Sequence, residues 1–247
     1  MKKLLSIIGL ALMASGLFAA EDIKTLVEAK NYTGIVKQAS ELLETAKTNS
    51  NQGAKSKVIN GIILARVCTG TYKTSAEAIT DLESMMRDIG YTRNNASWAR
   101  IFIYEKFNEL EKALAVPATD KSGQLRRAVV LAALKRYEEA ADTAFKVGTP
   151  LGISAAAKYI RLAKAPEKLY TYILTGFTTG SIKQPSEVKQ LVGFILETDF
   201  SGTTVTDAKI KVLLQTVNRR YSRLLKPGVV TAWDEVIQMV RQTLETY

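Results

Sequence analysis

The sequence contains no histidine and a single cysteine, Cys68, among its 247 residues. Without histidine there is no Ser-His or Cys-His nucleophile pair, and the commonest zinc ligand is missing. One cysteine also excludes an intrachain disulfide and a multi-thiolate metal site. We therefore expect no metal and no cofactor, and a chain that packing alone stabilises. Cys68 ends the apolar run VINGIILARVC and is interpreted as a small buried hydrophobe.

Motifs for enzymatic chemistry are also scarce. The sequence has no glycine-rich phosphate loop and no dinucleotide fingerprint. Ser186 and Lys189 have the Ser-x-x-Lys spacing of penicillin-binding proteins, but the companion Ser-x-Asn and Lys-Thr-Gly elements are missing, which favours a first-turn helix residue at Ser186. Glu105, flanked by Tyr104 and Phe107, is the candidate general acid of a wall-cleaving enzyme; its simpler interpretation is a solvated helix charge. We expect the protein not to be an enzyme.

The first twenty residues, MKKLLSIIGLALMASGLFAA, have the layout of a secretory signal peptide. Two lysines precede an apolar run, and Ala19 and Ala20 provide small residues for cleavage. The run is short for a membrane span, and glycines interrupt it. We therefore expect a signal peptide over residues 1–20, a single helical domain over residues 21–247, and a periplasmic or secreted bacterial protein without an integral membrane span after cleavage.

The chain is basic, with 34 Lys and Arg against 24 Asp and Glu, a formal net charge of +10. In the cell envelope such a surface indicates an anionic lipid or polymer, or an acidic protein partner, and export makes nucleic acid an unexpected partner. Cations concentrate over residues 207–226, where Asp207 is the one acid. Cations three or four residues apart on a helix would share a face that can bind phosphate or carboxylate groups. The alternative is a face that only increases solubility. This candidate anion or partner site comprises Arg219, Arg220, Arg223 and Lys226.

Apolar residues recur with the helical period along almost the whole chain. Trp233, Val236, Ile237 and Val240 fall on one helix face, and Thr231 precedes them as an N-cap. No run alternates apolar and polar residues well enough to require a strand. The periodicity predicts twelve helices, with the fifth open to a break near Phe107, over residues 22–30, 32–47, 53–68, 74–89, 95–115, 122–135, 136–147, 151–163, 166–177, 185–198, 204–225 and 230–246.

In residues 126–148, RRAVVLAALKRYEEAADTAFKVG, Tyr137 is followed by Ala140, Ala144 and Val147, and Ala128 lies in the preceding helix. A tyrosine at this place fills the corner between two helices, and the alanines let the helix backbones approach. The spacing resembles the helix pair of the tetratricopeptide family.

A fainter echo begins at Tyr32, while the stretch at Tyr72 is out of phase. Tyr32 and Tyr72 are 40 residues apart, and Tyr72 and Tyr137 are 65 apart, against a family period of about 34. The resemblance covers one clear pair. Its repeat-packing residues are Tyr137, Ala140, Ala144, Ala128 and Tyr32.

The resemblance implies an all-α fold, a right-handed α-α superhelix or tetratricopeptide-like stack of about twelve helices. An irregular globular helical domain is the alternative. In such a stack the concave helices are left open for recognition, which implies a non-catalytic exported scaffold that binds a peptide or protein partner in the cell envelope. Two other functions stay open: a binder of anionic envelope polymer or lipid through the basic C-terminal face, and a cell-wall-active enzyme.

Overall fold

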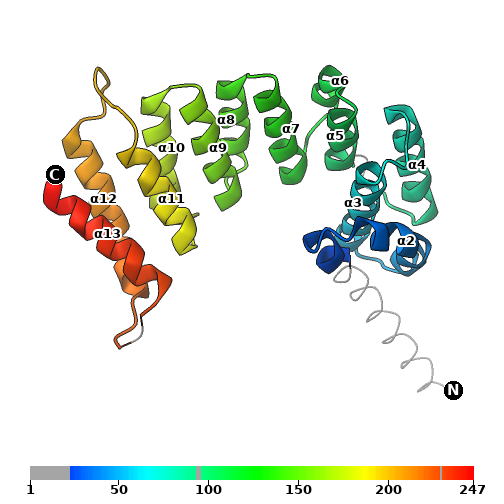
Figure 1. Ribbon diagram of the computed structural model, residues 1–247, viewed down its shortest axis with the longest axis horizontal. Coiled ribbons are helices and arrows are strands. Elements are labelled where there is room, and N and C mark those ends of the chain that lie inside the picture. The colour runs from blue at the N-terminus through cyan, green and yellow to red at the C-terminus, as the bar shows by residue number, and fades with distance from the viewer. Residues whose placement is uncertain (1–22, 93–95, 229) are drawn as a thin grey trace. The chain divides into compact units, whose positions relative to one another are not determined.

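The computed structural model describes residues 23–92, 96–228 and 230–247 (Figure 1). Over these ranges the chain forms twelve α-helices, α2 to α13, and one 3-10 helix, η1; residues 23–28 are helical as well, and no strand is present. The expected all-α fold is confirmed. None of the described helices is long and apolar enough to span a bilayer. The predicted signal peptide, residues 1–20, lies outside the described residues.

The chain divides into two compact units, unit 1 up to Arg126 and unit 2 from Arg127. The single helical domain expected over residues 21–247 stays a prediction beside this division. Unit 1 contains α2 (Tyr32–Lys47), α3 (Gln52–Cys68), α4 (Ser75–Asp88), α5 (Ser97–Lys106), α6 (Leu110–Ala115) and the first residues of α7 (Lys121–Ala133). Unit 2 contains the rest of α7, followed by α8 (Tyr137–Lys146), α9 (Pro150–Leu162), α10 (Pro166–Thr179), α11 (Pro185–Leu196), α12 (Asp207–Tyr221), η1 (Ser222–Leu224) and α13 (Ala232–Thr246).

Local sequence explains where the helices begin. Asn51 caps α3 by accepting from the backbone N–H groups of Gly53 and Ala54 at 2.8 and 3.2 Å. Thr231 and Asp234 form a capping box at the start of α13. Proline stands at the first helical position of α9, α10 and α11, where its missing N–H costs no hydrogen bond.

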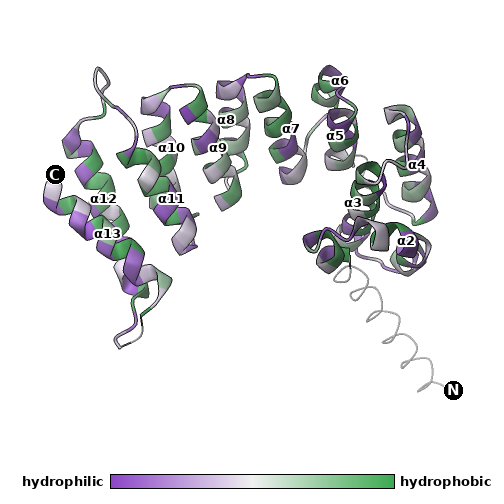
Figure 2. Ribbon diagram, in the orientation of Figure 1, coloured by the Kyte–Doolittle hydropathy of each residue, from purple (hydrophilic) through white to green (hydrophobic). Residues whose placement is uncertain are grey.

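Within each unit, consecutive helices pack in pairs, and alternate helices also touch. In unit 1, α3 contacts α2, α4 and α5; in unit 2, α9 contacts α8, α10 and α11, and α13 contacts α11 and α12. Contacts between a helix and both its next and its next-but-one neighbour are those of helix pairs stacked in two layers. Apolar residues of each helix point into this packing, which leaves polar stripes on the other faces (Figure 2). The fold is therefore all-α, with sequentially packed pairs consistent with a helical stack.

Four turns between helices repeat one backbone geometry, a left-handed φ at a residue that is not glycine. These residues are Lys30, Asn108, Lys135 and Lys164, with φ between 54° and 61°. Each lies two residues before the first residue of a helix (α2, α6, α8 or α10). The fourth residue of each of these helices is buried: Ile35, Ala113, Ala140 and Leu169. The same helix-turn-helix corner therefore occurs in both units.

Three details differ from the sequence-based expectations. Cys68 is exposed rather than buried, because it is the last residue of α3 and lies past the packed face of that helix. The helix expected over residues 95–115 is interrupted at Phe107, as the open alternative allowed, and continues as α6. The helix expected to reach residue 225 ends at Tyr221 and tightens into η1.

Candidate functional site

The predicted repeat-packing residues lie on α2, α7 and α8. Ala128, Ala140 and Ala144 are fully buried, on α7 and α8. Tyr137 and Tyr32 are half-buried and occupy the first position of α8 and of α2. These residues hold the scaffold together and leave little surface for a ligand.

The four predicted cations are divided by the early end of α12. Arg219 and Arg220 are in its last turn, Arg223 is in η1 and Lys226 is in the loop that follows, so the four do not form one α-helical face. Arg220 donates to the carbonyl of Thr178 at 3.1 Å and closes the end of α10. The other three are exposed.

The side chains singled out for enzymatic chemistry lie on two helices, Glu105 on α5 and Ser186 and Lys189 on α11. Glu105 is mostly buried and forms an ion pair with Arg126, which also lies over the ring of Phe102, 4.9 Å from its centroid. A carboxylate held against a guanidinium on an aromatic face serves as a structural clamp. Ser186 is exposed in the first turn of α11, as its position after a proline predicted, and Lys189 lies 3.9 Å from Glu235.

Two pockets in unit 1 adjoin Trp98, which lies at the start of α5. On one side is a polar pocket of about 610 Å³ between α3, α5 and the start of α7. On the other side is a mostly apolar pocket of about 330 Å³ between the helical segment 23–28, α3 and α5. Trp98 and Asn60 line both pockets, so the two pockets adjoin at these residues, and we call them together the Trp98 groove. Its polar part is lined by Ser56, Asn60, Tyr91, Ala96, Ser97, Trp98, Thr119, Asp120, Lys121 and Ser122, and its apolar part adds Ile23, Lys24, Val27, Glu28, Lys57, Gly61 and Leu64.

Two glycines allow the elements around the groove to come together. A Cβ at Gly61 on α3 would lie 2.6 Å from Ile23 Cδ1, so only glycine lets the segment 23–28 approach this closely. A Cβ at Gly123 would overlap the hydroxyl of Ser97, so the first turn of α7 rests directly on the start of α5. Both close approaches fix the walls of the groove on either side of Trp98.

Asp120 connects the polar wall. Its carboxylate accepts from Ser97 Oγ, from Ser122 Oγ at 2.5 Å and from the backbone N–H of Gly123 at 2.8 Å. Burial by itself would raise the pKa of Asp120, but these hydrogen bonds outweigh it and lower the pKa below its usual value. The side chain therefore stays ionised and caps α7.

Trp98 is half-buried and packs against the core of unit 1. Its ring stacks on Phe102 with centroids 5.1 Å apart, and the guanidinium of Arg126 lies 5.8 Å from the ring centroid. Beside it, the Asn60 amide makes a long bond of 3.5 Å to Ser56 Oγ. A fixed aromatic edge next to an amide that both donates and accepts suits recognition of a peptide group and a neighbouring apolar side chain.

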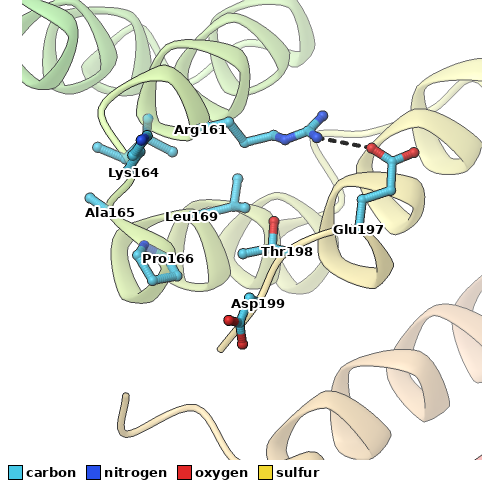
Figure 3. Close-up of a pocket in the computed structure, with 9 residues that line it drawn as sticks. Arg161, Lys164, Ala165, Pro166, Leu169, Glu197, Thr198 and Asp199 are labelled. Carbon is cyan, nitrogen blue, oxygen red and sulfur yellow. Dashed lines mark hydrogen bonds and ion pairs between the residues drawn. The ribbon is translucent and has the colours of Figure 1, made fainter. Parts of the chain in front are cut away.

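A second pocket, of about 320 Å³, lies in unit 2 where α9, α10 and α11 meet (Figure 3). Arg161 reaches across it to Glu197 at 2.9 Å and lies over the ring of Phe194, 4.3 Å from the centroid. Asp199 points away and accepts from the backbone N–H of Ser201. Since Arg161, Glu197 and Asp199 already bond to the protein, this pocket is a weaker candidate than the Trp98 groove.

Sequence reasoning did not single out the Trp98 groove. Trp98, Asn60 and Asp120 are far apart in the chain, and no local pattern marks them as neighbours. The nearest available signal is the Asp-Lys-Ser-Gly stretch at residues 120–123, an N-cap before a helix.

Among the described residues, no cluster of three or more His, Cys, Asp or Glu side chains could hold a metal ion. No family model, curated protein or solved structure matches this chain.

Proposed function

We propose that this chain is a non-catalytic, tetratricopeptide-like superhelical scaffold of the bacterial cell envelope that binds a peptide segment of a protein partner. The repeated left-handed turn and the two-layer packing support the superhelical repeat. The leader-like first twenty residues support export to the periplasm or the cell exterior.

The observation that carries the proposal is the shared position of Trp98 and Asn60 between a polar and an apolar pocket. An extended peptide presents backbone amides and side chains in alternation. In the Trp98 groove, one apolar side chain of the peptide enters the pocket beside Gly61 and Leu64, while Asn60 pairs with a peptide group of the ligand. Burial of that side chain against Trp98 supplies the main gain in free energy.

Trp98 also provides the readout, because the chain has two tryptophans and the other, Trp233, is in unit 2. In a Trp233→Phe background, peptides selected from a random displayed library are titrated against residues 21–247. We expect the selected peptides to share an apolar residue and to shift the emission of Trp98. Asn60→Ala should weaken binding roughly tenfold, the cost of a buried peptide group left without its partner.

The matched control is Gln238→Ala, which removes an exposed amide from α13 in unit 2 and should leave peptide affinity unchanged. Selection of no peptide, or peptides that bind Asn60→Ala and the parent equally well, would contradict a peptide-binding function at this groove.

A further inference from the structure

The loop between α12 and α13 extends past the ends of both helices (Figure 1). Apolar side chains near both ends of this loop are exposed. Leu224 is 46% exposed and Val230 is 91% exposed. Between them, a hollow of about 470 Å³ is lined by Leu225, Lys226, Pro227, Gly228, Val230 and Asp234. Val230 is thus almost fully hydrated at a projecting corner, where no described part of the chain covers it.

Cations lie close in the sequence to these apolar side chains, and Lys226 lines the same hollow as Val230. Arg219, Arg223 and Lys226 are exposed, and none of the three forms an ion pair among the described residues. From Ala208 to Trp233 the sequence has six Lys or Arg and no Asp or Glu. The corner therefore combines a concentrated positive charge with a hydrated apolar tip.

The carboxylates that come nearest are already bonded. Asp234, on the first turn of α13, accepts from the backbone N–H and the hydroxyl of Thr231 at 2.7 and 2.8 Å. Glu235, the next residue, lies 3.9 Å from Lys189 on α11. Their charge is directed toward the helix cap and toward α11, and Arg219, Arg223 and Lys226 stay exposed to solvent.

We propose that this corner docks on the surface of an anionic lipid bilayer. Val230 and Leu224 enter the boundary between headgroups and acyl chains, and Arg219, Arg223 and Lys226 contact the lipid phosphates. The positive charge of the corner favours an anionic surface. The exposed apolar tip favours a bilayer over a dissolved anion, because a dissolved anion would leave both apolar side chains in water. This inference concerns a different surface from the Trp98 groove and stands without it.

The test is co-sedimentation of residues 21–247 with vesicles, since an attached apolar leader would itself enter a bilayer. We expect binding to vesicles of equal parts phosphatidylglycerol and phosphatidylcholine and much weaker binding to phosphatidylcholine alone. Arg223→Glu and Lys226→Glu should each lower the affinity at least about fivefold. Val230→Asp should lower it roughly tenfold or more, because the apolar tip is lost.

Matched controls separate the corner from the general surface of unit 2. Val212→Asp changes another exposed valine, 55% exposed on α12, and Lys158→Glu reverses an exposed lysine on α9; both should bind as the parent does. Circular dichroism checks that each variant is folded. In a Trp98→Phe background, Trp233, which stacks on Tyr221 with centroids 5.0 Å apart beside this loop, should change its emission on binding.

Several outcomes would overturn the proposal. Equal binding to both vesicle types would remove the role of the cations, and unchanged binding of Val230→Asp would remove the role of the tip. Displacement by inorganic phosphate beyond the effect of chloride at equal ionic strength would indicate a site for dissolved phosphate instead of a bilayer. Failure to sediment with any vesicle would exclude membrane docking.

Discussion

Replacing Asp120 by alanine removes the residue that joins the start of α7 to the start of α5. Three hydrogen bonds end on its carboxylate, from Ser97, Ser122 and the backbone N–H of Gly123. Ser97 is 1% exposed, so its hydroxyl cannot exchange the lost partner for bulk water. The polar wall of the Trp98 groove depends on this one side chain.

The loss of free energy of unfolding has two main parts. Loss of an N-cap costs about 1 kcal/mol. An orphaned buried hydroxyl costs about 1–3 kcal/mol. Asp120→Ala should therefore destabilise unit 1 by about 2–4 kcal/mol. Removing the hydroxyl as well, in Ser97→Ala with Asp120→Ala, should recover part of the loss, because no buried donor is then left unpaired.

Urea unfolding of the Trp233→Phe protein follows unit 1 through the fluorescence of Trp98, and the Trp98→Phe protein follows unit 2 through Trp233. The midpoint seen by Trp98 should fall without a change in slope. Asp207→Ala, at an exposed first-turn carboxylate of α12, is the control and should cost about 0.5 kcal/mol through the helix dipole.

The charge of Asp120 also makes the stability of the folded protein depend on pH, in a direction that the lowered pKa defines. Its pKa is lowered in the folded protein and is about 3.9 in an unfolded chain, so its ionised form stabilises the fold above about pH 4. That stabilisation is lost as the pH falls through the folded pKa. The difference in stability between the parent and Asp120→Asn should therefore narrow in acid.

The reasoning is refuted if Asp120→Ala costs under about 0.5 kcal/mol, the level of ordinary surface substitutions, or if adding Ser97→Ala recovers none of the loss.

Two glycine-to-alanine substitutions should change the free energy of unfolding in opposite directions. Gly193→Ala, inside α11 where the added Cβ would make only an ordinary contact of 3.9 Å with Glu197 Oε1, should raise the free energy of unfolding by about 0.5–1 kcal/mol, measured in urea. Gly61→Ala should instead lower the free energy of unfolding by a net of about 1–2 kcal/mol. The new Cβ would lie 2.6 Å from the buried Ile23 Cδ1, and the cost of overpacking outweighs the gain in helix propensity. Equal effects at the two sites would show that the close approach of Ile23 does not matter.

Most of the secondary structure could be predicted because its signals are local. The face formed by Trp233, Val236 and Val240 and the cap at Thr231 place α13 within two residues of its observed start. For α13, a short window of sequence contains both the pattern and the residue that caps it. The break at Phe107, by contrast, was only an open alternative to one helix over residues 95–115.

Features that depend on distant residues or on exact helix ends were not predictable in this way. Cys68 was expected to be buried from its apolar neighbours, but one more residue past the packed turn is enough to expose it. The repeated turn was hidden because lysine or asparagine, where glycine is the usual signal, takes the left-handed conformation. The Trp98 groove depends on α3, α5 and α7 meeting, which no window of sequence records.

Two successive intervals between the repeated turns are shorter than the tetratricopeptide period. Asn108 to Lys135 spans 27 residues and Lys135 to Lys164 spans 29, against a period of about 34 residues. Val230 and Asn60 lie in different units, and the helix contacts within each unit join near neighbours along the chain. A loss of vesicle binding after a change at Val230 is therefore attributable to that corner, and a loss of peptide binding after a change at Asn60 to the Trp98 groove.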